Sequence, residues 1–246
     1  MKRKPEIVII SGIRLGSDAC RANELIQYLK SIRPTTLILN GGVFDVQGKS
    51  VRRFPKTHLK VLRYVLKMAA DGTRVWYVAG LGDQFLSAFG ELSLGQIEFR
   101  EKLVLQLGGL KYMIYPGETE AGPGFFEKTA QKIRSWTGWR TFKKHQVLVE
   151  NAVRLAQKAN CEAIICANPY RPRIRESVSA IQYLNTGVWS ENCSALEFNF
   201  SKWSLFTYHP ADFEVKNPKL TVKKSASDDE NAAFKSEDWS VYQTGI

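Results

Sequence analysis

The first third of the chain alternates two hydrophobic periods. Short apolar runs at Glu6–Ser11, Thr36–Asn40 and Arg74–Ala79 are typical of buried strands. Between them lie stretches whose apolar residues recur every three or four positions, which is the spacing of a helix that buries one face. The order strand, helix, strand, helix, strand predicts a parallel sheet with right-handed crossovers.

The two helices of this region have recognisable ends. The first is predicted to begin at Asp18 and to stop before Pro34, and the second to begin at Pro55 and to end at a Gly72 C-cap. The predicted buried stripes are Leu25, Ile26, Leu29 and Ile32 for the first helix, and Leu59, Leu62, Leu66 and Ala69 for the second.

The second half of the chain predicts shorter elements. Extended segments are expected within residues 97–115, and a helical region within residues 123–160. The later part of that region has one apolar stripe, which consists of Leu148, Ala152, Leu155 and Ala159. Further short strands are predicted at Lys111–Tyr115, Cys161–Cys166, Ile181–Asn185, Ala195–Asn199 and Ser204–Tyr208.

Composition narrows the class of protein. The chain has 246 residues, of which 44% are hydrophobic and 24% charged, which excludes wholesale disorder and a disulfide miniprotein. No apolar run approaches the roughly 18 residues of a membrane-spanning helix. The four cysteines form no CxxC pair, which argues against a cysteine-based zinc site and favours reduced thiols in a cytoplasmic protein. The three histidines are isolated along the sequence and predict no metal or catalytic site.

Positive and negative charges are unevenly distributed along the chain. The net charge is +11, although Ser225–Ile246 holds five acids and one base. A strongly basic body attracts phosphorylated ligands, anionic lipid headgroups or nucleic acid, and charge does not choose between them. A basic protein without any such partner is an equally open interpretation. We expect a main domain at residues 1–216 and a flexible acidic tail at residues 217–246.

Glycines follow most of the predicted strands. In open α/β sheets ligands bind beyond the carboxyl ends of the strands, so these loops are the first place to look for a site. The loops are Gly12–Ser17, Gly41–Asp45, Gly80–Asp83, Pro116–Glu118 and Ala167–Pro172. Each glycine alone is explained equally well by a tight turn.

The loop sequences resemble a known family. Ser11–Ser17 (SGIRLGS) resembles the SDxHLG loop of the calcineurin-like metallophosphoesterases, and Asn40–Asp45 (NGGVFD) resembles their GDxxD loop. Ala79–Asp83 is similar to GNHD, Pro116–Glu118 stands where HGD falls, and Cys166–Pro172 is similar to GHTHxP. The order and intervals match across residues 7–200. The branch most resembled is that of the UDP-2,3-diacylglucosamine hydrolase-like proteins, which Cys20–Ala22, Gly72–Val75, Ile174–Glu176 and Asn185–Trp189 all fit, with Asn185–Gly187 retained.

The resemblance implies a fold and an activity. The fold is an α/β/β/α sandwich with a helical cap inserted at about residues 122–146. The activity of the family is hydrolysis of phosphoesters or pyrophosphates with two divalent metals such as manganese. Residues 1–216 would form this metallophosphoesterase-like domain.

The metal-ligand positions of the family are all replaced in this chain. At those positions stand Gly12, Arg14, Gly42, Leu81, Pro116, Asn168 and Tyr170, and Gly82 replaces the histidine that assists the phosphate. Hard divalent ions need carboxylate or imidazole donors, which glycine, leucine and proline do not offer. The sequence therefore predicts no metal cofactor, no catalytic residues and loss of the hydrolysis.

The degenerate pocket retains candidate ligand-binding residues. These are Arg14, Asp45, Asp83, Asn168, Tyr170 and Arg171. Arg14 brings a fixed positive charge, which can pair with a phosphate or with Asp45. The alternative for Asp45 and Asp83 is hydrogen bonding to loop amides, and the alternative for Arg171 is simple solvation.

A basic and aromatic segment occupies the predicted cap. Phe125–His145 carries six lysines and arginines against one acid, with aromatic residues interleaved. Lys132, Trp136, Trp139 and Arg140 are candidates for contact with an anionic membrane surface or a lipid phosphate, at the inner face of the membrane. Packing of the aromatics on the main domain is the alternative, and nucleic acid is disfavoured because no recognition motif accompanies the charge.

Three functional hypotheses follow. The first is a non-catalytic relative that binds a phosphorylated or lipid-like ligand or a protein partner. The second is an active phosphoesterase with an altered metal site, built for example from Asp45, Asp83, Glu118 and Glu120. The third is a structural scaffold subunit.

Overall fold

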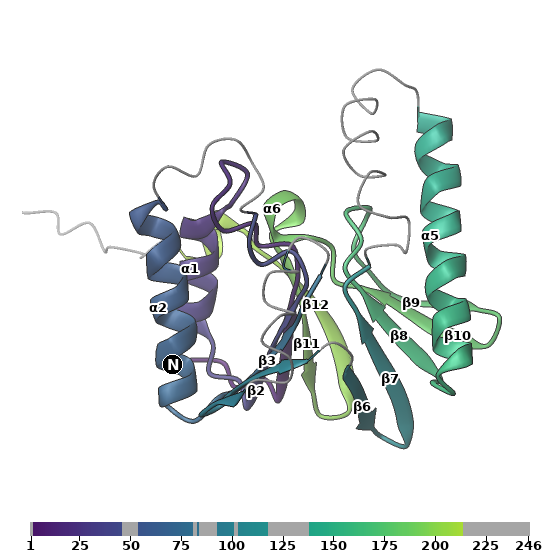
Figure 1. The fold of residues 1–246 in the computed structure, drawn as a ribbon, viewed down its shortest axis with the longest axis horizontal. Helices are drawn as coiled ribbons and strands as arrows, with labels where there is room; N and C mark the ends of the chain where they lie inside the picture. Colours follow the sequence, from purple (N-terminus) through teal and green to yellow (C-terminus); the bar gives the residue numbers. More distant parts are fainter. Residues whose placement is uncertain are drawn as a thin grey trace, which may run out of the picture. The chain divides into compact units, whose positions relative to one another are not determined.

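The computed structural model describes residues 2–45, 54–80, 83, 93–100, 103–117 and 138–213 (Figure 1). Of residues 138–145 and 175–177 it describes the backbone only. The chain divides into two units, Met1–Phe213 and Glu214–Ile246, and every described residue belongs to the first. The predicted tail at 217–246 and the first part of the predicted cap, 122–137, lie outside the described residues.

The first sheet has seven strands in the order β12-β11-β1-β2-β3-β5-β4. The bounds are β1 Ile7–Ile10, β2 Thr36–Asn40, β3 Arg74–Val78, β4 Ser93–Leu94, β5 Ile97–Arg100, β11 Ser194–Asn199 and β12 Lys202–Thr207. β1, β2, β3 and β5 are parallel neighbours, which confirms the predicted crossover units. The sheet as a whole is mixed, because β11, β12 and β4 pair antiparallel with their neighbours.

The second sheet has five strands in the order β6-β7-β8-β10-β9. The bounds are β6 Leu103–Leu107, β7 Leu110–Tyr115, β8 Ala163–Cys166, β9 Arg173–Val178 and β10 Ile181–Asn185. The three central strands β7, β8 and β10 are parallel, and the edge strands β6 and β9 pair antiparallel with them. The carboxyl ends of β7, β8 and β10 therefore meet at one edge.

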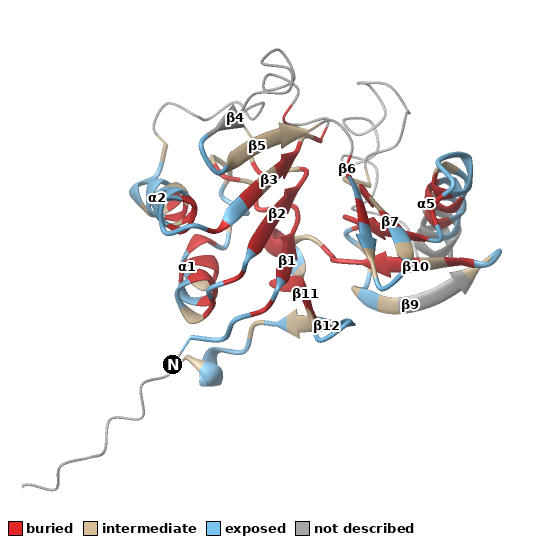
Figure 2. Cartoon of the chain, turned by 90° about the horizontal axis from the view of Figure 1, so that it is seen from below, coloured by how far each residue is buried: buried red, intermediate tan, exposed pale blue. Residues whose placement is uncertain are grey.

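The two sheets and three helices form four layers (Figures 1 and 2). α1 (Ala22–Ser31) and α2 (Lys56–Ala70) cover the outer face of the first sheet, and α5 (Gly138–Lys158) covers the outer face of the second. Strand alternation divides the side chains of β1 between two cores: Val8 and Ile10 face the helices, whereas Ile7 and Ile9 face the second sheet. The structure thus confirms the predicted α/β/β/α layers.

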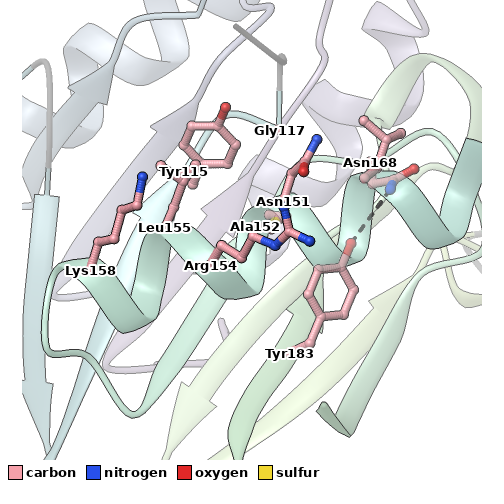
Figure 3. A pocket seen from close by; sticks show the side chains of 11 residues that line it. Tyr115, Gly117, Asn151, Ala152, Arg154, Leu155, Lys158, Asn168 and Tyr183 are labelled. Atoms are coloured by element: carbon pink, nitrogen blue, oxygen red, sulfur yellow. Dashed lines mark hydrogen bonds between the residues drawn. The ribbon is translucent and has the colours of Figure 1, made fainter. Parts of the chain in front are cut away.

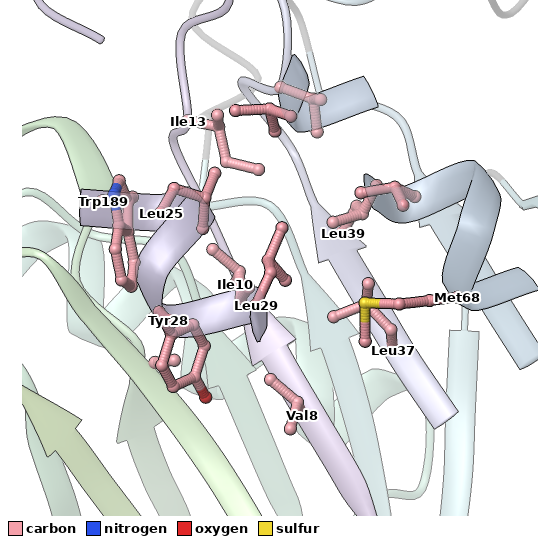
Figure 4. Packing of buried hydrophobic residues seen from close by; sticks show 14 of the residues in the cluster. Val8, Ile10, Ile13, Leu25, Tyr28, Leu29, Leu37, Leu39, Met68 and Trp189 are labelled. Atoms are coloured by element: carbon pink, nitrogen blue, oxygen red, sulfur yellow. The ribbon is translucent and has the colours of Figure 1, made fainter. Parts of the chain in front are cut away.

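Figure 4 shows the core beneath the first two helices. Leu25 and Leu29 of α1 pack against Val8, Ile10 and Leu37 of the sheet, and all five are at most 2% exposed. Burial of such a side chain contributes about 1.5–3 kcal/mol. Because the strands are covered on both faces, they appear in the sequence as continuous apolar runs.

The predicted buried stripe of α2 is wrong at two of its four positions, whereas Ala69 is buried as predicted and Leu62 is half-buried against the core. Leu59 and Leu66 are 52% and 58% exposed, whereas Val61, Val65 and Met68 face the core. The buried face also contains a polar residue that the hydrophobic pattern could not place there: His58 is buried, and its Nδ1 accepts a hydrogen bond from the Gly16 amide at 3.0 Å. Its role is structural, and burial lowers the pKa of His58.

The ends and stripes of the other two helices differ less from prediction. α1 begins at Ala22 rather than at Asp18, because Ser17–Cys20 forms a turn in which the Cys20 amide donates to the Ser17 carbonyl at 3.1 Å. Of the predicted stripe of α5, Ala152 is buried and Leu148 and Leu155 are half-buried, whereas Ala159 is exposed and lies past the end of the helix. The other buried residues of α5 are Val149, Val153 and Ala156. None of the helices in the described part of the chain is long and apolar enough to cross a membrane.

A buried polar bridge ties α1 to the first sheet. Glu197 of β11 is 8% exposed and accepts hydrogen bonds from the Tyr28 hydroxyl at 2.8 Å and from the Arg3 guanidinium at 2.7 and 2.8 Å. Burial and the neighbouring carboxylate raise the pKa of Tyr28, so the hydroxyl remains a donor.

Tyr28→Phe is expected to lower the free energy of unfolding by about 2 kcal/mol, since a buried carboxylate loses one of its donors. Urea denaturation measures this loss. Tyr208→Phe is the matched control, because its hydroxyl donates to Gln27 at 2.6 Å on the exposed surface, and there the loss should stay below about 0.5 kcal/mol. Equal losses in the two variants would contradict the assigned role of Glu197.

Candidate functional site

The loops after β1 and β2 are joined to each other by backbone hydrogen bonds. The Gly12 amide donates to Gly41 and the Arg14 amide to Gly42, each at 2.9 Å, and the Leu15 amide donates to Val43 at 2.7 Å. The parallel pairing of the two strands therefore continues past their ends. These loops form the edge at which the sequence predicted a ligand site.

Close packing fills the space beside these glycines. A Cβ atom on Gly12 would lie 2.5 Å from the Cβ of Val188, and one on Gly41 would lie 2.5 Å from the Cβ of Pro116. A Cβ on Gly42 would approach the Gly12 Cα to 3.3 Å. All three glycines have φ between 59° and 68°, a conformation that residues with a side chain rarely adopt. Val188, Pro116 and the Gly12 backbone thus fill the space beside these glycines, two of which, Gly12 and Gly42, stand at positions that hold metal ligands in the resembled family.

Asp83 holds the next loop to this pair. Its carboxylate is fully buried and accepts hydrogen bonds from the amides of Phe44 at 2.9 Å, Val43 at 3.2 Å and Gly80 at 3.4 Å. This confirms the alternative in which Asp83 bonds loop amides. Burial raises the pKa of Asp83, and the amide donors oppose that rise only in part.

The raised pKa of Asp83 predicts a pH dependence of stability. Because the folded chain holds this proton more tightly than the unfolded chain, the contribution of Asp83 is fully present below about pH 4 and is lost as pH rises through the folded pKa. As the pH rises from about 4 to about 7, the unfolding free energy of Asp83→Asn should therefore fall by less than that of the parent. Urea denaturation measures both. Asp71→Asn, on the exposed end of α2, should keep the parental slope, and identical slopes in all three proteins would refute the assignment.

Asn185 organises the loops of the second sheet. Its Nδ2 donates to the carbonyls of Tyr170 at 2.9 Å, Asn168 at 3.1 Å and Arg171 at 3.2 Å. Its Oδ1 accepts from the amides of Asn168 at 2.9 Å and Gly187 at 3.0 Å. The candidate residues Asn168, Tyr170 and Arg171 therefore sit on one loop that a single buried carboxamide fixes.

A hydroxyl pair joins the loops of the two sheets. Thr186, after β10, donates to the Ser11 hydroxyl after β1 at 2.8 Å, and both side chains are fully buried. The amide of Trp189, at the start of the short helix α6 (Trp189–Asn192), donates to the Ser11 carbonyl at 2.7 Å. These contacts fix Val188 against Gly12.

The structure places the remaining candidates around these joined loops. Arg14 is half-buried with φ of 59°. Asp45 lies on the paired loop, where its amide donates to the Leu15 carbonyl at 2.9 Å. Among the described residues no ion pair joins Arg14 to Asp45. Burial raises the pKa of Tyr170, with a further contribution from Glu191.

The side chains of the four candidate membrane residues lie outside the described part of the structure. Lys132 and Trp136 lie outside the described residues, and Trp139 and Arg140 fall in the first turn of α5, where only the backbone is described. Within the part of the chain that is described, no group of three or more histidine, cysteine or acidic side chains is placed to hold a metal ion.

A pocket that the sequence analysis did not predict lies between α5 and the carboxyl ends of β7, β8 and β10 (Figure 3). Its volume is about 230 Å³, and it is lined by Tyr115, Gly117, Leu148, Asn151, Ala152, Arg154, Leu155, Lys158, Cys166, Asn168 and Tyr183. Of these, only Asn168 was a predicted site residue. The available signal was the spacing of Arg154 and Lys158, one helical turn apart and flanking the apolar Leu155.

Comparison with known proteins gives similarities of fold. No family model matches the chain, and no curated protein matches it. Among solved structures, an archaeal phosphodiesterase is 11% identical with a TM-score of 0.41, over 82% of this chain and 98% of that one. Wild-type Vps29 of Entamoeba histolytica in complex with zinc is 16% identical with a TM-score of 0.44, over 82% and 91%. A conserved Streptococcus pneumoniae protein described as a predicted phosphoesterase is 15% identical with a TM-score of 0.36, over 82% and 87%.

Proposed function

We propose that this chain is a non-catalytic member of the calcineurin-like metallophosphoesterase superfamily, and that it acts by binding rather than by hydrolysis. The observation that carries the proposal is the packing of Gly12 against Val188, where a Cβ atom would lie 2.5 Å from its neighbour. A ligating side chain at this position has no space. The resemblance of the loop motifs supports membership of the superfamily. The replacement of their metal-ligand residues supports the loss of hydrolytic activity.

The residues present do not fit a pair of divalent metals. Gly42 faces the Gly12 backbone, and Gly41 faces Pro116, so the loop after β2 also has no room for a ligand. The retained carboxylate of Asp83 is engaged by the loop amides. A hard cation here would find glycines at two of the positions where carboxylate or imidazole donors would have to stand. We therefore propose that no divalent metal resides here.

The more detailed assignments are part of the same proposal. The Asn185–Trp189 sequence, which contains the carboxamide network, supports descent from the UDP-2,3-diacylglucosamine hydrolase-like branch. The basic and aromatic segment Phe125–His145 supports contact with an anionic membrane surface. The excess of positive charge favours a phosphorylated ligand over a neutral one.

Metal analysis and a hydrolysis assay on the same sample test the proposal. The full-length chain is incubated with excess manganese, desalted and analysed by elemental mass spectrometry, and then assayed with bis(p-nitrophenyl) phosphate. We expect sub-stoichiometric manganese and no hydrolysis above a protein-free control. An active metallophosphoesterase assayed in parallel verifies the conditions. Two bound manganese ions per chain with metal-dependent turnover would support the altered-site enzyme instead.

A further inference from the structure

The pocket beneath α5 shares one residue, Asn168, with the replaced metal-ligand positions, but its other walls differ from those of the closed crevice. Its walls come from one face of α5 and from the outer face of the second sheet, whereas the closed crevice is lined by the loops after β1, β2 and β3. Figure 3 shows the side chains of Arg154 and Lys158 projecting from the helix at this pocket, with Tyr183 on the sheet below. A ligand here would not need the crevice to be open.

The charge of this pocket is positive. Arg154 and Lys158 are exposed at its rim, and no carboxylate is among its lining residues. Within the described residues neither cation takes part in an ion pair. The acid one turn before Arg154, Glu150, accepts a hydrogen bond from Gln146 at 3.1 Å. Two unneutralised cations one turn apart are suited to an anion that carries two negative charges.

The floor of the pocket is polar and buried. Tyr183 and Asn168 are 1% and 3% exposed, and the Asn168 Nδ2 lies 3.5 Å from the Tyr183 hydroxyl. Cys166 also lines the floor, and burial raises the pKa of its thiol, so it adds no negative charge. The floor is therefore polar and uncharged, and it does not oppose the positive rim.

The walls and the volume limit the size of the ligand. Leu148, Ala152 and Leu155 supply apolar surface along α5. A volume of about 230 Å³ is below the roughly 300–1,000 Å³ of pockets that bind drug-sized molecules. It is enough for a phosphate group attached to a short apolar or aromatic body.

We propose that this pocket binds a small organic phosphate monoester, with the phosphate between Arg154 and Lys158 and the organic part against Leu148 and Leu155. The proposal goes beyond the loss of hydrolysis, because it assigns a ligand class to a different place in the fold. Phosphate is favoured over a monoanionic carboxylate because a dianion pairs with both cations at once.

Calorimetric titration of the full-length chain with phenyl phosphate tests this site at about 150 mM salt, where surface attraction is screened. We expect one site per chain, with affinity for phenyl phosphate at least about tenfold higher than for benzoate or benzyl alcohol. Arg154→Gln and Lys158→Gln should each weaken binding about tenfold, and Arg154→Lys should retain part of the affinity. Both side chains are exposed, so the variants should keep the parental melting temperature.

Lys60→Gln is the matched control, since it removes the same charge from the exposed face of α2. Its affinity for phenyl phosphate should equal that of the parent. The proposal is overturned by the absence of saturable binding, by equal affinity for benzoate, or by equal effects of Lys60→Gln and Arg154→Gln. The manganese and hydrolysis assay remains independent of all these outcomes, so failure of one proposal leaves the other standing.

Discussion

Gly12→Asp is expected to destabilise the fold by about 3 kcal/mol and to create no metal site. The substitution restores the kind of side chain that the resembled family has at this position. Its Cβ would lie 2.5 Å from the Val188 Cβ and 2.7 Å from the Val188 Cγ1. Overpacking of this kind costs about 1–3 kcal/mol, and the left-handed backbone adds about 1–2 kcal/mol for a residue with a side chain. Urea denaturation measures the loss, and elemental analysis after manganese loading measures the metal.

Two further variants separate the clash from the backbone cost. Gly108 has φ of 58°, close to the 60° of Gly12, and nothing lies within 4 Å of a Cβ placed there. Gly108→Asp should therefore lose only the backbone part, about 1 kcal/mol. Combining Gly12→Asp with Val188→Gly should relieve part of the clash, so the stability losses of the two substitutions should not be additive. A fully stable Gly12→Asp variant that binds manganese would show that the crevice is open.

The positions of most strands could be predicted because the chain buries them completely. The predicted bounds of Thr36–Asn40 and Ile181–Asn185 coincide with β2 and β10, and both strands are apolar where they contact two layers. β12 begins two residues earlier than its predicted start at Ser204. The preceding hairpin turn places Phe200 and Ser201 at φ of 47° and 61°, and neither is the glycine or asparagine that usually signals such a turn.

The site could be predicted only in part, since its key contacts join distant parts of the chain. The sequence identified Gly12 as a replaced ligand, but the residue that fills the space, Val188, comes from the loop after β10. It identified Asn185 as retained, but not that one carboxamide holds three carbonyls. The predicted face of α2 was wrong at Leu59 and Leu66 because the prediction followed the leucines, whereas His58 takes a buried position through a hydrogen bond from the Gly16 amide. Polar contacts of this kind leave no trace in a hydrophobic period.

Asn185→Asp is expected to have the largest pH-dependent effect on stability, with a loss of about 4 kcal/mol near pH 7. The side chain is fully buried, and the atom that now donates to the carbonyls of Asn168, Tyr170 and Arg171 would become an acceptor. A carboxylate facing three carbonyl oxygens is repelled by them, so the folded state should raise the pKa of the new acid. Stability should then be highest below about pH 4 and fall as pH rises, because the unfolded chain releases the proton first.

Denaturation in urea at about pH 4.5 and pH 7.5 checks the sign and the size of this effect. Asn185→Ala removes the same hydrogen bonds without introducing a titrating group. It should lose about 3 kcal/mol of unfolding free energy at both pH values and keep the pH dependence of the parent. Asn23→Asp places the same new charge on the exposed surface of α1 and should change stability by less than about 0.5 kcal/mol. If Asn185→Asp were as stable as Asn23→Asp at both pH values, the buried carboxamide could not be what holds the loop that bears Asn168, Tyr170 and Arg171.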